Sequence, residues 1–472
     1  MGWFKNMMRN WLEIGPSASV RNVILSDEDF GKEVLRNKIW YRGNPAELSQ
    51  FYALSDGLVA QKSFWAECGA DAAMRKMHSG LPALIVDVLA DIGAGDLLAV
   101  KMGDKHAQTV WDAIAAENDF GRLLKRAARK ALALGDGAFK ISFDEDVSEY
   151  PIIEFFGADR VRFDYSRGRA REIVFCSEIE EGSDSYVLEE AYSVGKISYR
   201  LRDKGDKEVD LASVGKGREF LPIEHDLGIN LAVSLIFDEN PRFEGRGKSV
   251  FDGKLGAFDV LDEVLSQWVD ALRDGRAQKY IPAGLLPRNP HNGEIMGLSP
   301  FQSRFIRTEM DLAEGADNSI KMLQANIDTA ALSASCANYL NFALQGIIAP
   351  STLGIDLKGR DNAEAQREKE KATLYTRGRI IGVLREVVGR LAEAAVAAYN
   401  GFHGKEGVDC KAKVEFGEYA MPDFGSQIEI IGRGRQMGVI SVENAVEQLY
   451  GSSWSAEEKE AEAGRLKLET RG

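Results

Sequence analysis

The sequence predicts an α+β protein that is mainly α-helical, with an antiparallel β-rich unit between two helical parts. Apolar residues recur at spacings of three and four in residues 119–134 and 251–276, which indicates amphipathic helices. Between residues 138 and 201 the apolar period changes to two, and turn signals separate the short runs. The chain has 472 residues, of which 44% are hydrophobic. This is enough for roughly two to four domains.

Residues 1–137 are expected to be mainly helical. Apolar side chains form one face of residues 81–99, which predicts a helix there. Residues 119–134 give the clearest pattern, because leucine and alanine occupy one face and Lys and Arg occupy the other. Gly135-Asp136-Gly137 is expected to end this helix.

The β-rich unit is expected to cover residues 138–250. Short runs of alternating apolar and polar residues are separated by turns rich in Gly, Asp and Ser. The predicted strands are residues 138–144, 152–156, 161–165, 172–177, 186–192 and 197–201. Short connections of this kind favour an antiparallel meander.

An apolar stripe predicts a helix over residues 251–276, about 26 residues and ~39 Å long. The stripe consists of Phe251, Leu255, Phe258, Leu261, Leu265, Trp268 and Leu272. The same segment carries six acidic and three basic side chains, so its net charge is −3.

Residues 277–326 interrupt the helical pattern and predict a compact irregular insertion. They contain four prolines and the dipeptide Asn292-Gly293, which is typical of a tight hairpin turn. Asp328 is then a candidate N-cap for a helix over residues 329–347, which Pro350 and the polar residues after it end.

The longest predicted helix covers residues 362–399, about 37 residues and ~55 Å. That length exceeds the usual range for globular proteins and indicates a scaffold that extends across subunits, or a kink. A strand is expected at residues 411–416, and helices at 441–450 and 455–469. Residues 432–435, Gly-Arg-Gly-Arg, are expected to form a helix-breaking turn.

Composition disfavours several functional classes. The net charge of −14 makes tight binding to a phosphate backbone unfavourable, since such affinity comes largely from Lys and Arg. Neither the histidines nor the cysteines have the spacing of a zinc site, and we expect no metal and no cofactor. Reduced, mostly buried thiols in a cytosolic protein are expected at Cys68, Cys176, Cys336 and Cys410.

One glycine-rich motif resembles the end of a P-loop. Residues 245–249, Gly-Arg-Gly-Lys-Ser, contain the GKS of that motif, but Arg242 stands where the first glycine is required. We therefore expect a flexible turn before the helix at residue 251, and no ATP site. No Ser-His-Asp or Cys-His arrangement can be nominated, so no catalytic residues are predicted.

Two charged clusters have both a functional and a structural interpretation. Asp259, Asp262, Glu263 and Asp270 could bind a metal ion, but nuclease sites usually draw acids from several elements. A solvated or pore-facing side of an amphipathic helix is the favoured interpretation. The second cluster, Lys125, Arg126, Arg129 and Lys130, is interpreted as a solvated helix face rather than a nucleic-acid surface.

Four stretches resemble the portal proteins of tailed siphophages. The first is Ile39-Trp40-Tyr41-Arg42-Gly43-Asn44, followed by Glu47-Leu48. The second and third are LDEVLSQWVDALRDGRAQKYIPAGLLPRNP (261–290) and IIAPSTLGIDLKGRDNAEAQREKEKATLYTR (347–377). The fourth is the tail MGVISVENAVEQLYG, followed by Glu-rich residues. The resemblance covers nearly the whole chain, and the two central stretches are the most specific.

The resemblance implies a portal fold with eight regions. Residues 1–137 would be the helical part of the wing, 138–250 its β-rich part, and 363–417 the long wing helix with its return strand. Residues 251–276 and 327–349 would be the two stem helices, with the clip at 277–326 between them. The tunnel loop would be residues 350–362, and the crown residues 418–472.

The resemblance also implies candidate functional residues. Lys358 and Arg360 in the tunnel loop would be neighbours of DNA. Asp259, Asp262 and Asp270 are expected to give the channel an acidic lining, which would repel a duplex and keep it mobile. In the clip, the docking candidates are Lys279, Tyr280, Arg288 and the stretch His291, Asn292 and Gly293.

The function implied is a ring-shaped channel, usually of twelve copies, at one capsid vertex. It would serve packaging of double-stranded DNA, attachment of the tail or connector, and genome ejection. The implied partners are other copies of the chain, DNA in transit, the terminase, the major capsid and scaffolding proteins, and head-completion or adaptor proteins. The implied location is the virion, with the host cytoplasm during assembly.

Three alternatives belong to other classes. A minor capsid or adaptor protein would lack the very long helix after a short loop. A nuclease or ATPase would show turnover with magnesium and DNA or ATP. A general host scaffold protein would form no ring.

Overall fold

The structure is a computed structural model. It describes residues 30–54, 63–66, 74–181, 184–215, 220–275, 277–286, 290–291, 305–309, 319–324, 326–355, 363–404, 410–417, 424–437, 439–450 and 454–469. The chain divides into two compact units, Met1–Glu415 and Phe416–Gly472, and each is described by itself. The first combines helices with mostly antiparallel sheets, so the predicted α+β class is confirmed.

The N-terminal helices pack around α8, which has the amphipathic form that the sequence predicts. Leu123, Leu124 and Ala127 are buried on one face, whereas Arg122 and Arg126 are exposed on the other. Helix α8 packs against α6 and α3. The bounds are α3 (Phe30–Arg42), α4 (Pro45–Leu54), α6 (Leu81–Ala94), α7 (Lys105–Glu117) and α8 (Phe120–Leu134).

The predicted helix over residues 81–99 is shorter than expected. Helix α6 ends at Ala94, and Leu97–Met102 forms strand β1, which pairs with β14 (Ala412–Phe416). An apolar run of this length does not by itself distinguish helix from strand. The strand partner lies far along the chain, so local periodicity could not reveal the pairing.

The β-rich unit contains two sheets, and the predicted meander is present. Strands β2 (Asp136–Ser142), β3 (Ile152–Gly157) and β10 (Ala232–Ile236) form a three-stranded antiparallel sheet in the order β10-β2-β3. Helix α8 packs against β2 and β3. This sheet therefore joins the β-rich unit to the helices.

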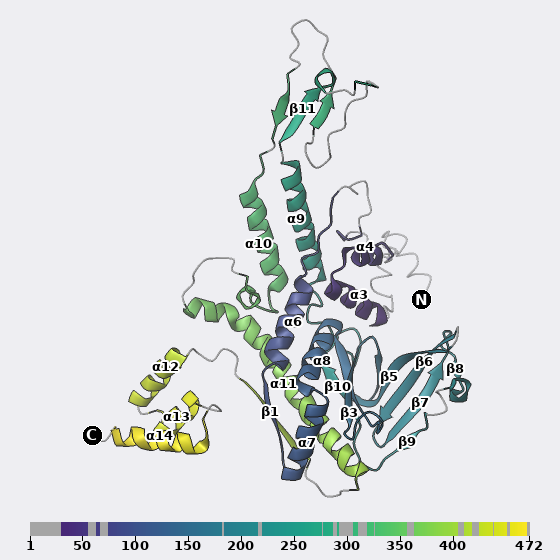
Figure 1. The fold of residues 1–472 in the computed structure, drawn as a ribbon, viewed down its shortest axis with the longest axis vertical. Coiled ribbons are helices and arrows are strands. Elements are labelled where there is room, and N and C mark those ends of the chain that lie inside the picture. The colour runs from purple at the N-terminus through teal and green to yellow at the C-terminus, as the bar shows by residue number, and fades with distance from the viewer. Residues whose placement is uncertain are drawn as a thin grey trace, which may run out of the picture. The chain divides into compact units, whose positions relative to one another are not determined.

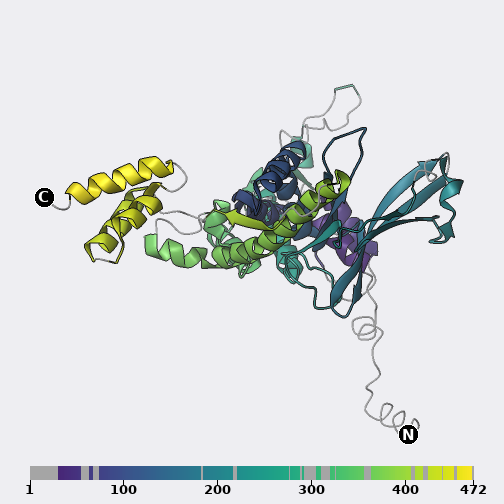
Figure 2. The same ribbon diagram turned by 90° about the horizontal axis from the view of Figure 1, so that it is seen from below.

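The larger sheet has six strands, with order β4-β5-β6-β7-β8 and β9 beside β7. Its main strands are antiparallel neighbours in sequence order, as expected for a meander. Figure 2 shows this sheet in teal, extending away from the green helix α11 (Ala363–Phe402). The bounds are β4 (Val161–Ser166), β5 (Arg169–Glu181), β6 (Asp184–Ser193), β7 (Lys196–Arg202), β8 (Glu208–Val209) and β9 (Ile223–Glu224); a short 3-10 helix, η1 (Leu211–Ser213), follows β8.

The glycine-rich motif at residues 245–249 is a buried junction rather than the flexible turn expected. The Arg246 guanidinium forms two hydrogen bonds of 2.8 Å with Asp136, whose side chain is fully buried. It also lies 3.9 Å from the ring centroid of Phe30. A Cβ atom on Gly247 would lie 2.2 Å from the Gly135 carbonyl oxygen, so only glycine fits there. The motif therefore joins α3, β2 and the chain leading to α9.

Helices α9 (Leu255–Asp274) and α10 (Thr329–Leu344) lie side by side (Figure 1). The first is shorter than the predicted helix over 251–276, because Gly253 has a positive φ of 77° and residues before Leu255 form turns. Asp328 caps α10 as predicted, with its carboxylate accepting a hydrogen bond of 2.9 Å from the Ala331 amide.

The insertion between α9 and α10 contains a small three-stranded sheet in the order β12-β11-β13. Its β11–β12 pair is parallel and its β11–β13 pair antiparallel. Figure 1 shows β11 beyond the ends of α9 and α10. The bounds are β11 (Gln278–Pro282), η3 (Ala283–Leu285), β12 (Phe305–Thr308) and β13 (Lys321–Leu323). The turn predicted at Asn292-Gly293 lies outside the described residues.

After α10, the short 3-10 helix η4 (Pro350–Leu353) leads towards α11. Helix α11 has 40 residues, so the prediction of one very long helix is confirmed. It packs against α6, α7 and β10, and its buried face includes Leu384, Val388 and Leu391. Together with α8, it therefore joins the helices to the β10-β2-β3 sheet.

The second unit consists of α12 (Phe424–Gln436), α13 (Val442–Tyr450) and α14 (Ala456–Glu469). The last two correspond to the predicted helices. The turn predicted at residues 432–435 is wrong, because these residues lie inside α12. A Cβ atom on Gly434 would lie 2.6 Å from Ile440 Cδ1, so this glycine permits close packing instead of breaking the helix.

Two carboxylates at the base of α9 bind the chain segment that precedes α6. We call residues 63–66 and 74–80 the N-terminal strap. Asp262 is fully buried and accepts hydrogen bonds from the Ser79 amide at 2.8 Å and Trp65 Nε1 at 3.2 Å. His78 Nδ1 lies 2.7 Å from the same carboxylate. One turn away, Asp259 accepts hydrogen bonds from the Ser63 hydroxyl at 2.6 Å and the Phe64 amide at 2.9 Å.

The contact continues along the same face of α9. Ser266 accepts a hydrogen bond of 2.9 Å from the Met77 amide, and spacings of three and four residues place it in line with both carboxylates. Trp65 and Trp40 are fully buried around this contact. The strap therefore supplies donors to charges that would otherwise be buried without partners, which is costly.

We predict that Asp262→Ala lowers the free energy of unfolding by about 3 kcal/mol, because several buried donors lose their acceptor. Urea unfolding followed by tryptophan fluorescence measures this. Protein concentration is held fixed, since association adds to apparent stability. The matched control is Glu263→Ala, because the Glu263 carboxylate is partly exposed and accepts a hydrogen bond of 3.0 Å from the exposed Gln267 side chain. Equal losses in the two variants would contradict the role assigned to Asp262.

Candidate functional site

The surface of α10 is unusual for a helix that faces water. Its 16 residues include no Asp, Glu, Lys or Arg, yet only Ala343 and Leu344 are buried. The aromatic side chains of Tyr339 and Phe342 are 40% and 56% exposed. Solvent-facing helices normally carry charged residues on the free face. An uncharged exposed helix with apolar groups is instead suited to packing against another protein surface.

The acidic residues of α9 separate into two groups with different surroundings. Asp259 and Asp262 face the N-terminal strap, and burial raises the pKa of Asp259 although hydrogen bonds from Ser63 and Phe64 oppose that shift. The prediction that Asp262 lines a channel is wrong for this fold, because its side chain is inaccessible. Asp259 is likewise occupied by the strap.

Asp270 differs from these two residues because it lies about one turn beyond Ser266, the last α9 residue in the strap contacts described above. Together with Glu263 and Gln267 it occupies spacings of three and four, which places all three on one stripe of α9. Gln267 is exposed, and Glu263 and Asp270 are partly exposed. This stripe can present negative charge to solvent, to a neighbouring protein or to a passing polyanion.

The two basic candidates Lys358 and Arg360 lie outside the described residues, as does the rest of segment 356–362. The structure describes the chain on both sides of it. Before the segment, Gly354 has a positive φ of 72° and ends η4. After it, α11 begins at Ala363.

The candidates in the insertion are only partly described. Tyr280 lies on β11 and is partly exposed, and His291 is exposed in a turn. Lys279 also lies on β11. Arg288, Asn292 and Gly293 lie outside the described residues. The insertion also exposes large apolar side chains, namely Leu285, Ile320, Met322 and Leu323, each more than half exposed. Such groups are typical of a surface that binds another protein.

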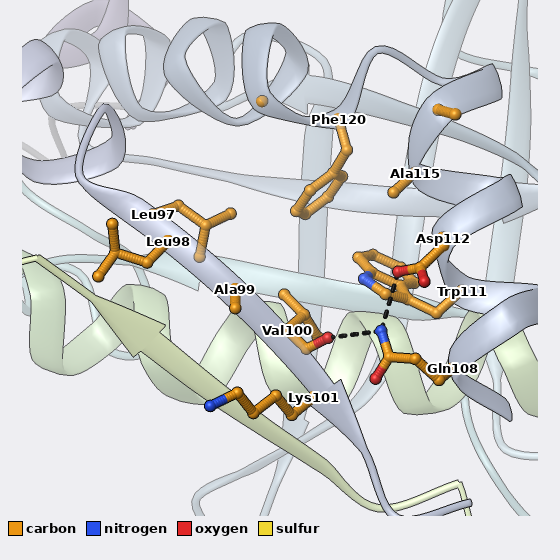
Figure 3. A pocket seen from close by; sticks show the side chains of 12 residues that line it. Leu97, Leu98, Ala99, Val100, Lys101, Gln108, Trp111, Asp112, Ala115 and Phe120 are labelled. Atoms are coloured by element: carbon orange, nitrogen blue, oxygen red, sulfur yellow. Dashed lines mark hydrogen bonds between the residues drawn. The ribbon is translucent and has the colours of Figure 1, made fainter. Parts of the chain in front are cut away.

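A shallow groove of about 510 Å³ lies between β1 and the helices α7 and α8 (Figure 3). At its polar end, the Gln108 side-chain amide donates hydrogen bonds to the Val100 carbonyl at 3.0 Å and to Asp112 at 2.8 Å. Lys101 pairs with Glu415 at 2.7 Å. The Gln108 contacts hold β1 against α7. The residues that line the groove include no paired nucleophile and base of the kind that a catalytic site needs.

The described residues contain no group of three or more His, Cys, Asp or Glu that could hold a metal ion. None of the helices in the described ranges is long and apolar enough to cross a membrane. Cys176, Cys336 and Cys410 are free thiols, partly rather than fully buried, and Cys68 lies outside the described residues.

The N-terminal strap is a structural element that the sequence did not indicate, and it determines which acids of α9 are accessible. Ser63, Trp65 and His78 follow no helical or strand period, and their partners on α9 lie almost 200 residues away. The available signal was that Asp259 and Asp262 lie beside the apolar stripe of α9. Carboxylates at such positions are candidates for buried acceptors as well as for a solvated face.

Among solved structures, the chain is similar to a chain in the neck of the native GTA particle computed with C12 symmetry. Identity is 12%, 81% of this chain and 89% of that chain are covered, and the TM-score is 0.40. A chain in the virion of the native gene transfer agent particle is 14% identical, with 93% and 94% covered and a TM-score of 0.39. A chain in the neck of the empty particle computed with C6 symmetry is 14% identical, with 78% and 89% covered and a TM-score of 0.39.

A comparison with curated proteins finds no match. The family described as "Phage portal protein, SPP1 Gp6-like" matches residues 27–353. That range is more than half of the chain, and it contains α3 to η4, including the α9–α10 pair and the insertion between its helices. The chain therefore belongs to the SPP1 Gp6-like family of phage portal proteins, which are structural components of the virion and not enzymes.

Proposed function

We propose that the chain assembles into a closed ring of twelve copies at one capsid vertex, and that double-stranded DNA passes through the ring during packaging and ejection. Family membership supports this proposal, and the uncharged exposed surface of α10 is the observation that carries it. In this assignment, residues 251–276 and 327–349 are the stem and 277–326 the clip. Residues 350–362 are the tunnel loop, 1–137, 138–250 and 363–417 the wing, and 418–472 the crown.

The ring explains how α10 is covered. A surface patch that binds a different patch on the next copy gives a head-to-tail interface, which closes into a ring when the rotation allows it. Small side chains such as Ala334 and Ser333, both exposed, permit close approach of a neighbouring helix. Tyr339 and Phe342 supply the larger apolar groups of the same surface.

The charge on α9 suits a passage for DNA. The duplex carries about one negative charge per 1.7 Å of its axis. Glu263 and Asp270 would be repeated in every copy, so a ring that turns them inward presents rings of negative charge. Repulsion keeps the duplex mobile, while Lys358 and Arg360 are proposed to make the transient attractive contacts.

The proposed partners follow from the regions. Head-completion or adaptor proteins and the terminase would bind at the insertion, where exposed apolar side chains accompany Lys279, Tyr280, Arg288 and the His291–Gly293 stretch. The major capsid and scaffolding proteins would surround the ring at the vertex. Assembly would take place in the host cytoplasm, before the ring is enclosed in the virion.

Ala334→Glu should shift purified protein from rings towards monomers, because a charge repeated in every copy would have to be buried in each interface. Mass photometry at sub-micromolar to micromolar concentration measures the distribution. The matched control is Ala46→Glu, at an exposed position of α4, and it should assemble like the wild type. Unchanged rings in Ala334→Glu would contradict the assignment of α10 to the interface.

The double variant Glu263→Lys and Asp270→Lys should slow DNA packaging several-fold, because rings of positive charge would hold the phosphate backbone. The amount of nuclease-protected DNA at successive times in a packaging reaction measures this. The charge-matched control is Glu145→Lys with Glu208→Lys, two exposed acids of the β-rich unit. If both double variants form rings and package at the wild-type rate, the acidic passage is refuted.

A further inference from the structure

The surface of α8 carries charge of one sign only. Its 15 residues include five Arg or Lys and no Asp or Glu. All apolar side chains of the helix are buried, so its solvent-facing side chains are the five bases Arg122, Lys125, Arg126, Arg129 and Lys130. Three pairs of these bases are four residues apart, and like charges at that spacing destabilise a helix. No acid within α8 offsets this repulsion.

Acids from other elements neutralise only part of this charge. Arg129 lies 3.3 Å from Asp87 and 3.0 Å from Asp91, both on α6. Arg126 and Lys130 make no ion pair with any of the described residues. An exposed helix is usually supported by acids that alternate with its bases, and this part of α8 lacks them. Its bases are therefore available to an anion from outside the chain.

Two bases from other elements lie beside these two. Lys38 belongs to α3, and Arg160 lies in the turn between β3 and β4; both α3 and β3 pack against α8. Desolvation lowers the pKa of Lys130, although Asp159 opposes that shift. The nearby charges of Arg126, Arg160 and Lys38 lower it further. We call Lys38, Arg126, Lys130 and Arg160 the basic patch.

The basic patch keeps a net positive charge after its internal contact is counted. Lys38 donates a hydrogen bond of 2.8 Å to Asp159, whereas Arg160 makes no ion pair with any described residue. Four bases and one carboxylate leave a net charge of +3. The chain as a whole has a net charge of −14, so this surface departs from the rest of the molecule in sign.

The chemistry of the patch suits an extended polyanion. Its bases come from two helices and a turn, so they are spread over a surface. The buried core of a protein interface is largely apolar, but the exposed face of α8 offers no apolar side chain. Contacts with a phosphate backbone require only positive charge and hydrogen-bond donors. Arg126 and Lys130, both exposed and unpaired in the described part of the chain, supply both.

We propose that the basic patch binds the phosphate backbone of double-stranded DNA outside the channel. This inference rests on the proposed function, because DNA that has passed through the ring comes to lie against its surface. Binding by one copy is weak, since the net charge of the chain opposes it, and is multiplied by the number of copies in the ring. The patch would hold DNA, whereas the acidic stripe of α9 repels it.

Closed circular DNA tests the patch separately from the channel, because a circle has no end that can thread through an assembled ring. Filter binding of a labelled minicircle to purified rings is measured between about 50 and 200 mM salt. The triple variant Arg126→Ala, Lys130→Ala and Arg160→Ala should bind at least about tenfold more weakly at the lowest salt. Its slope of log K against log salt should be less steep by about 2 to 3, because each lost phosphate contact removes about 0.9.

Two controls separate the patch from net charge and from a protein partner. Lys196→Ala, Arg390→Ala and Lys413→Ala together remove the same charge from exposed sites elsewhere and should bind like the wild type. Arg126→Lys with Arg160→Lys should also bind like the wild type. A phosphate backbone responds to positive charge, whereas pairing with a partner's carboxylates depends on the planar fork of Arg.

Three results would overturn the inference. The first is an equal salt slope in the triple alanine variant and the wild type, and the second is a minicircle left unbound by wild-type rings at about 50 mM salt. The third is loss of rings in the triple alanine variant, measured by mass photometry, which would place the patch between copies. Wild-type protein that forms no rings would instead contradict the proposed function, and the minicircle comparison would then be made on the monomer.

Discussion

The burial of Asp262 is the constraint on which the arrangement of the first unit depends. A carboxylate without contact to water must be matched by donors, and those donors come from the N-terminal strap at Trp65, His78 and Ser79. Asp259 extends the same contact by one turn. Because the strap leads directly into α6, and α6 packs against α8 and α11, the direction of α9 is tied to the helices that pack against the β10-β2-β3 sheet. The α9–α10 pair can therefore present the uncharged surface of α10 while the base of α9 stays fixed.

Three polar contacts connect distant parts of the first unit, from the β-rich unit to the segment before α11. Arg246 joins Phe30 of α3 to Asp136 of β2, the strap joins α6 to α9, and the hydroxyls of Thr373 and Thr376 join the segment after α10 to α11. Each uses a buried polar side chain to satisfy groups from a distant part of the chain. Removing one partner of such a contact costs more than an exposed ion pair contributes, since the remaining groups stay buried without a partner. The exposed surface of α10 has no comparable partner among the described residues, and this difference separates the scaffold from the surface assigned to neighbouring copies.

The sequence predicted the elements whose information is local. The apolar face of α8, the alternating strands of the meander, the Asp328 cap and the length of α11 all follow from periodicity and capping within a short window. Most of the wrong predictions concern residues whose structure depends on a partner far along the chain. Strand β1 exists because β14 pairs with it, and Asp262 is buried because the strap supplies its donors. The error at residues 432–435 is more local, since Gly434 lies inside α12 and is closely packed against Ile440. Asp259 and Glu263 lie four residues apart on α9. The first is bound by the strap and the second faces solvent, a difference that periodicity alone could not predict. The DNA-contact candidates Lys358 and Arg360 came from family resemblance, and the described residues do not include them.

The account as a whole claims that many copies place their α9–α10 pairs around one shared channel. Cryo-electron microscopy of the purified full-length chain tests this claim most directly. The account requires a closed ring in which α10 of each copy packs against its neighbour, Glu263 and Asp270 face the central opening, and Asp262 stays covered by the strap. A reconstruction with α10 packed inside its own copy, or with the α9–α10 pairs on the outer surface of the assembly, would contradict it.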